Sequence, residues 1–179
     1  MSPNCWGSSA SCGTVFKVTT GGKLTTIYKF DQTHGAGPFS PLIQGTDGNF
    51  YGTTSAGGTS GLGVVFRLTS TGVMTVLHNF IGSDGETPLA GLIQANDGNF
   101  YGVASAGGSL GFGTIFKVTS TSDHTFSVVY DFDQTHGSAP KVALFQHTNG
   151  ALYGDTYTGG SDGAGVFYSC LLYTSDAAD

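Results

Sequence analysis

Short apolar stretches alternate along the chain with turns that are rich in glycine. In residues 24–30, Leu24, Thr26, Tyr28 and Phe30 share one face, which predicts a β-strand with a buried side. No stretch has the 3.6-residue period of an amphipathic helix. The same reasoning predicts further strands at residues 14–18, 42–44, 50–55, 64–68, 73–80, 92–94, 100–105, 114–118, 126–132, 144–146, 152–157 and 166–168.

This pattern repeats about every 50 residues. Residues 91–118 copy residues 41–68 with few changes, and a more divergent copy begins at residue 143. Recurring apolar residues are what stacked units need, because each unit buries one face against its neighbour. The aligned columns are Phe16/Phe66/Phe116, Phe30/Phe80/Phe132, Pro38/Pro88/Pro140, Leu42/Leu92/Leu144 and Tyr51/Tyr101/Tyr153.

Four short strands per repeat, joined by turns, predict an all-β protein built as a β-propeller of four-stranded antiparallel blades. A propeller ring needs at least about four blades, so we expect a partial, open propeller and a fragment of a longer protein. The expected divisions are residues 1–40 (a loop and half a blade), 41–90 and 91–142 (complete blades), 143–169 (a truncated blade) and 170–179 (a tail).

The composition narrows the range of partners. The chain has six Lys and Arg against twelve Asp and Glu, a net charge of -6, and no basic cluster that would bind nucleic acid. No apolar run is long enough to predict a transmembrane helix, and no signal peptide is visible. No motif for a catalytic nucleophile, a phosphate loop or a zinc protease occurs, so we expect neither a cofactor, a metal site nor an enzyme.

The loops offer weak candidates for a ligand site. In an up-and-down blade, the loops after the second and fourth strands lie on one face, and binding residues concentrate on such loops. The candidate residues there are Asp31, His34, Asp84, Asp133 and His136. Because His34, Asp84 and His136 occupy one column, each before a glycine, we favour a turn-forming role over ligand contact. The same reasoning makes Asp47, Asp97 and Asn149 turn residues.

Two other sets of residues have competing interpretations. Cys5 and Cys12 lie in a loop of glycine and serine, where they form either a disulfide or two free thiols. Lys17, Arg67 and Lys117 follow the recurring phenylalanine, so alternation places them on the other face of the strand, where we expect them to be solvated.

The motifs Gly-Thr-Val-Phe-Lys-Val, Tyr-Lys-Phe-Asp and Pro-Leu-Ile-Gln-Gly-Thr-Asp-Gly-Asn-Phe-Tyr-Gly-Thr-Thr-Ser-Ala-Gly-Gly resemble the GloVer tandem repeat over residues 13 to 167. The resemblance implies a bacterial protein that is exported or held at the cell surface, a propeller fold and no assigned activity. A weaker similarity, through Asp-Gly-Asn-Phe-Tyr, is to the NHL-type and two-component-regulator propellers. Residues 170–179 match nothing in the repeat and resemble a translated sequencing adapter.

Three hypotheses for function follow. The first is a non-enzymatic surface protein that binds glycans or other surface molecules. The second is a polysaccharide lyase or glycosidase on a propeller, which needs two converging carboxylates. The third is a structural spacer or the sensor domain of a larger receptor.

Overall fold

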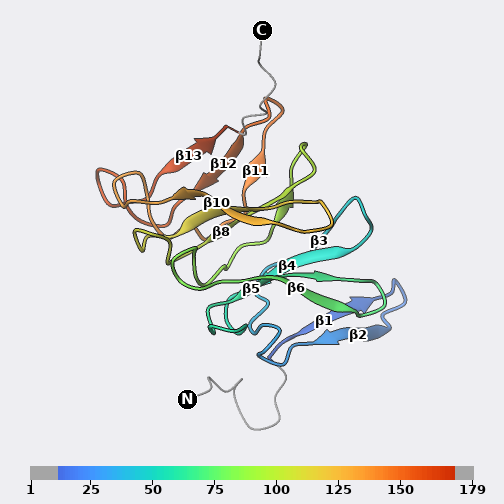
Figure 1. Ribbon diagram of the computed structural model, residues 1–179. Helices are drawn as coiled ribbons and strands as arrows, with labels where there is room; N and C mark the ends of the chain where they lie inside the picture. The colour runs from blue at the N-terminus through green and yellow to red at the C-terminus, as the bar shows by residue number, and fades with distance from the viewer. Residues whose placement is uncertain (1–11, 172–179) are drawn as a thin grey trace.

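A computed structural model describes residues 12–171. All regular secondary structure in this range is β: thirteen strands form four antiparallel sheets, and the range contains no helix. The sheets follow one another along the chain and in space, from the blue strands near the N-terminus to the red strands near the C-terminus (Figure 1).

We number the sheets in chain order. Sheet one contains β1 (Thr14–Val18) and β2 (Leu24–Lys29). Sheet two contains β3 (Ile43–Gln44), β4 (Phe50–Thr54), β5 (Val64–Leu68) and β6 (Met74–Asn79). Sheet three contains β7 (Ile93–Gln94), β8 (Phe100–Ala104), β9 (Thr114–Val118) and β10 (Phe126–Asp131). Sheet four contains β11 (Phe145–Gln146), β12 (Leu152–Asp155) and β13 (Phe167–Cys170).

The hydrophobic pattern therefore located every strand, and the differences lie at the ends. The strand expected at 152–157 ends at Asp155, since at the next residue the amide of Val166 donates to the side-chain hydroxyl of Thr156 and not to a backbone carbonyl. The strand expected at 166–168 instead covers Phe167–Cys170. Cys170 lies opposite Leu152 and packs against its cluster, so β13 takes in the first residue of the expected tail.

Aromatic rings join each sheet to the next. Phe30, which follows β2, meets Phe66 of sheet two edge-to-face with ring centroids 5.2 Å apart. Phe80 meets Phe116 in the same way, and Phe132 meets Tyr168. The recurring aromatic columns are therefore the contacts between sheets, as the repeat requires.

The long loops on one side of the molecule pair with one another. Ala36, in the loop after β2, exchanges two backbone hydrogen bonds with Ala56, in the loop after β4. Glu86 with Ala106 and Ser138 with Thr158 repeat this bridge. A Cβ at Gly57 would lie 2.6 Å from the carbonyl oxygen of Gln32, so glycine is required where the loops meet. The loops expected to share a face thus form one connected layer, which we call the long-loop layer.

Candidate functional site

Four of the five candidate residues of the long-loop layer form acid–histidine pairs within single loops. Asp31 accepts a hydrogen bond from the backbone amide of His34 and lies 2.8 Å from its ring Nδ1. Asp133 and His136 repeat both contacts at 2.8 Å. Partial burial acts to raise the pKa of Asp31, but the hydrogen bonds from His34 outweigh it and hold that pKa below its usual range.

The middle loop builds its turn with its carboxylate at the other end of the turn. Ile81 stands where the outer loops have aspartate, and Asp84 stands where they have histidine. The Asp84 carboxylate accepts the Ile81 amide at 2.9 Å, so the loop is still capped by a carboxylate. This arrangement supports the turn-forming interpretation of the column.

The second oxygen of Asp84 lies 2.7 Å from Nε2 of His78 on β6, a residue that the sequence analysis did not select. His78 stacks on Phe126 of sheet three with centroids 3.5 Å apart. Burial lowers the pKa of the His78 imidazole, and the hydrogen bond and the charge of Asp84 act in the opposite direction. The sequence did contain a signal for His78, because it occupies the column that holds tyrosine in the other repeats, at Tyr28 and Tyr130.

The three pairs serve three separate loops, and no hydrogen bond or ion pair within residues 12–171 joins one pair to another. In the same range, no group of three or more His, Cys, Asp and Glu side chains is placed to hold a metal ion. The arrangement stabilises turns and presents the loop backbones on a rigid base.

The tight turns on the opposite side contain a second repeated network. The Asp97 carboxylate accepts hydrogen bonds from the backbone amide and the side-chain amide of Asn99. It also accepts one from the hydroxyl of Tyr101 at 2.7 Å. Asp47 makes the same three contacts in sheet two. In sheet four, Asn149 takes over the role and donates to the hydroxyl of Tyr153. These turns are therefore tied to the strand that follows them.

Glutamine side chains connect these turns across neighbouring sheets. Oε1 of Gln94, in sheet three, accepts the backbone amide of Thr46 in sheet two at 2.9 Å. Gln146 accepts the amide of Asn96 in the same way at 2.8 Å. Each glutamine also donates to the carbonyl of the glycine in its own turn. The sheets are thus linked in register on this side.

The basic column is exposed at Lys17, as alternation suggested, but Arg67 and Lys117 are only partly exposed. Arg67 is half-buried between sheets two and three, where Nη1 lies 3.4 Å from Nε2 of His124. Facing sheets cover the side of β5 that a single sheet would leave open. Only the packing of one sheet on another decides this, so the sequence of β5 could not show it.

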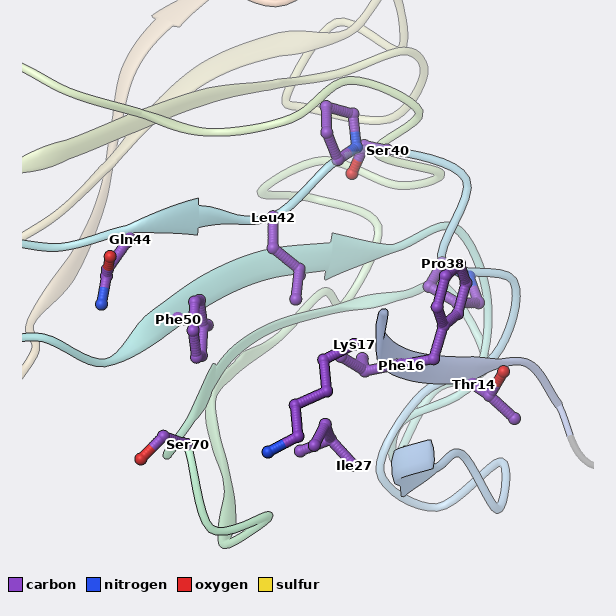
Figure 2. A pocket seen from close by; sticks show the side chains of 12 residues that line it. Thr14, Phe16, Lys17, Ile27, Pro38, Ser40, Leu42, Gln44, Phe50 and Ser70 are labelled. Atoms are coloured by element: carbon purple, nitrogen blue, oxygen red, sulfur yellow. The ribbon is translucent and has the colours of Figure 1, made fainter. Parts of the chain in front are cut away.

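A groove of about 590 Å³ opens between sheets one and two. Figure 2 shows the Lys17 side chain extending from β1 across this groove, with Leu42 and Phe50 on the opposite wall. Gln44, Ile27 and Ser40 complete its lining. None of the candidate ligand residues of the sequence analysis lines this groove, because the groove exists only where two sheets fail to cover one another.

The possible disulfide between Cys5 and Cys12 stays a prediction, because Cys5 lies outside the described residues. Cys12 is positioned by its backbone, which donates to the carbonyl of Phe30 and accepts from the amide of Gly37. Cys170 is a free, half-buried thiol, and burial raises its pKa. Among the described residues, no helix has the length and apolar character needed to cross a membrane.

Comparison with known proteins identifies the repeat. No curated protein matches the chain. Among solved structures, the extracellular domain of a hybrid two-component system from B. thetaiotaomicron matches with a TM-score of 0.51 and 17% identity, over 88% of this chain. The match covers 20% of that chain, so this protein spans a fifth of its length, and at this identity the likeness shows the fold alone. The model of the Gloeobacter/Verrucomicrobia repeat matches residues 4–177, and the chain therefore belongs to this repeat family, as its motifs predicted.

Proposed function

We propose that this chain is part of an extracellular bacterial protein whose repeats are propeller blades and whose long-loop layer binds a ligand without catalysing a reaction. The repeat family and the extracellular domain that shares the fold support an extracellular role. The proposed ligand class is a surface glycan or a similar polar polymer.

The stacking of the sheets supports the propeller assignment. Each sheet runs outward strand by strand, and each packs a face on the sheet that follows. Repeated sheets of this kind, about 50 residues apart, are the building plan of a propeller. We infer that sheets two and three are its complete blades.

The observation that carries a binding role is the exposure of rings on a rigid loop layer. Phe39 is 75% exposed and Tyr157 is 67% exposed, and both belong to loops held by the paired backbone bridges. The ammonium group of Lys141 lies 3.7 Å from the centroid of the Tyr157 ring. Exposed rings beside hydrogen-bonding backbone suit a partner with both apolar and polar faces, such as a sugar ring.

The acidic side chains of this layer favour binding over hydrolysis. A glycosidase needs two carboxyl groups about 5–10 Å apart around one bond. Here the carboxylates of Asp31, Asp84 and Asp133 cap three separate turns and pair with histidines. The fold shared with the extracellular part of a two-component system favours a sensor domain as the second candidate function.

The test is a glycan array probed with the full chain, followed by titration of any ligand found. Phe39→Ala and Tyr157→Ala should each weaken binding about tenfold or more, because each removes an exposed contact ring. Val73→Ala is the matched control, since Val73 is also exposed but lies at a tight turn on the other side. Binding that is lost with Val73→Ala and kept with both loop variants would contradict the proposal, as would cleavage of the glycan.

A further inference from the structure

The groove between sheets one and two lies along an edge of β1 that has no partner among the described strands. Within residues 12–171, β1 pairs with β2 alone, whereas its counterparts β5 and β9 are paired on both edges. Phe16 of β1 is 56% exposed, while Phe66 and Phe116 in the same column are fully buried. The free edge of β1 can accept a further strand through its backbone groups.

The apolar wall of the groove is a surface that another sheet covers elsewhere in the molecule. Tyr51 of β4 stacks on Phe100 of the next sheet with ring centroids 4.0 Å apart and planes inclined by 25°. Phe100 is fully buried as a result, whereas its counterpart Phe50 is half-buried and lines the groove. The space over Phe50 therefore matches the place that a tyrosine ring occupies one repeat later.

The side chain of Gln44 in the groove also lacks a partner that its counterparts in the next repeats have. Gln94 and Gln146 each accept a turn amide from the preceding sheet. Gln44 donates to the carbonyl of Gly48, as its counterparts do to their own turns, but its Oε1 has no partner within the described residues. This oxygen is placed to accept the amide of a tight turn lying in the groove.

The ammonium group of Lys17 in the groove also lacks the carboxylate that its counterpart Arg67 has nearby. Burial acts to raise the pKa of the Asp47 carboxyl group, but hydrogen bonds from Asn49 and Tyr51 outweigh it. The nearby positive charge of Arg67 lowers this pKa further. Lys17 occupies the Arg67 column, and its ammonium group makes no hydrogen bond or ion pair with any residue of the chain that the structure describes. A carboxylate that entered with a turn would face this ammonium group.

We propose that the groove binds a β-hairpin of the same repeat, with the sequence Asp-Gly-Asn-aromatic-Tyr, carried by another chain of the family. Its second strand pairs with the free edge of β1, as β8 pairs with β9. Its tyrosine ring covers Phe50, its aspartate faces Lys17, and its turn amide donates to Gln44. Apolar, polar and charged positions of the groove are all satisfied by this one occupant.

The hairpin has a specific fit that a generic β-strand lacks. Its aromatic–Tyr pair is followed by glycine, and a Cβ at Gly52 or Gly102 would lie within 3 Å of the phenylalanine ring on the paired strand. The corresponding glycine of the hairpin would leave room for the ring of Phe16. A hairpin alone is marginally stable, so its binding and folding should be coupled.

A fluorescent peptide of residues 91–106, which contains β7 and β8, tests the proposal when it is added to the full chain. We expect saturable binding with one peptide per chain, and slower hydrogen exchange at the backbone amides of β1. The Tyr101→Ser peptide should bind about tenfold or more weakly, because it loses the ring over Phe50. In the protein, Lys17→Gln should weaken the wild-type peptide and should leave an Asp97→Asn peptide nearly unaffected.

The controls separate a specific site from general adhesion to an exposed edge. A peptide of scrambled sequence reports adhesion, and Thr148→Ala, at an exposed turn of sheet four, is a matched surface change away from the groove. Equal affinities for the wild-type, Tyr101→Ser and scrambled peptides would overturn the proposal. So would the absence of binding to a folded, monomeric full chain. A dimer of the full chain that the peptide dissociates would support the proposal and identify a second copy as the source of the hairpin.

Discussion

At the scale of single residues, this repeat uses its polar side chains to hold turns. Asp47, Asp97 and Asn149 were predicted as turn residues, and their hydrogen bonds to the amide two positions along confirm that role. Their link to the tyrosine hydroxyl was not predicted, because it depends on how the strand leaves the turn.

Replacing Tyr101 by phenylalanine should destabilise the fold. The change removes the hydroxyl that donates to Asp97, a hydrogen bond to a charged group in a half-buried place, so we expect a loss of about 1.5 kcal/mol. Tyr153→Phe is the matched control. Its hydroxyl accepts from the neutral Asn149 on an outer sheet, and the loss should be smaller. Urea unfolding measures both, and equal losses would contradict the assigned role of the carboxylate.

The second residue-scale prediction concerns Asp133, whose pKa is lowered to about 2. The backbone amide of His136 is the main cause and the histidine ring is the second. Because the folded-state pKa lies below the ordinary value, this carboxylate stabilises the fold above pH 4, and the contribution disappears as the pH falls towards 2.

His136→Asn should therefore leave the pKa of Asp133 still clearly below the ordinary range, since the backbone donor is retained. An NMR titration of the Asp133 carboxyl carbon measures it. A return to the ordinary value would show that the imidazole, and not the turn, controls this position. His34→Asn provides the parallel measurement at Asp31.

At the scale of elements, strands with the same sequence pattern differ in burial according to their neighbours. β5 and β9 are buried along almost their whole length, whereas β1 is exposed at four of five positions. The pattern predicted all three strands, since it records which face suits a core. The pattern did not show the groove, because the burial of a strand depends on whether a neighbouring sheet packs against it.

The close approach of strands β8 and β9 provides a prediction at this scale. A Cβ at Gly102 would lie 2.5 Å from Cζ of Phe116 and 2.7 Å from Cδ2 of Leu92, so Gly102→Ala should destabilise the protein by about 1–3 kcal/mol. Gly21→Ala is the control, because its Cβ would meet nothing closer than 3.9 Å. Thermal unfolding compares the two. Similar melting temperatures would mean that the Phe116 ring can move aside without cost.

At the scale of the whole molecule, the outer sheets expose apolar side chains beside unpaired strand edges. Phe167 on β13 is 73% exposed, and β13 pairs only with β12 among the described strands. Such an edge recruits other chains, and a net charge of -6 over 179 residues provides little repulsion. We therefore expect the chain to self-associate at high concentration.

Phe167→Lys should reduce this self-association several-fold, because a lysine on an edge strand opposes pairing with another chain. Leu110→Lys adds the same charge at an exposed loop position that belongs to no strand, and it should have little effect. Sedimentation velocity over a range of concentrations measures both variants. If the two lysines act equally, net charge and not the strand edge controls association.

The sequence by itself determined the all-β class, the approximate position of each strand, the repeat family and the turn-forming role of Asp47, Asp97 and Asn149. These follow from local preferences and from a period that the chain displays directly, so they need no knowledge of packing. Only the tertiary structure decided that Arg67 is half-buried, that His78 pairs with Asp84 and that a groove lies over Phe50. Each of these depends on residues that are distant in sequence or on the packing of neighbouring sheets, and the spacing of residues within one repeat does not contain that information.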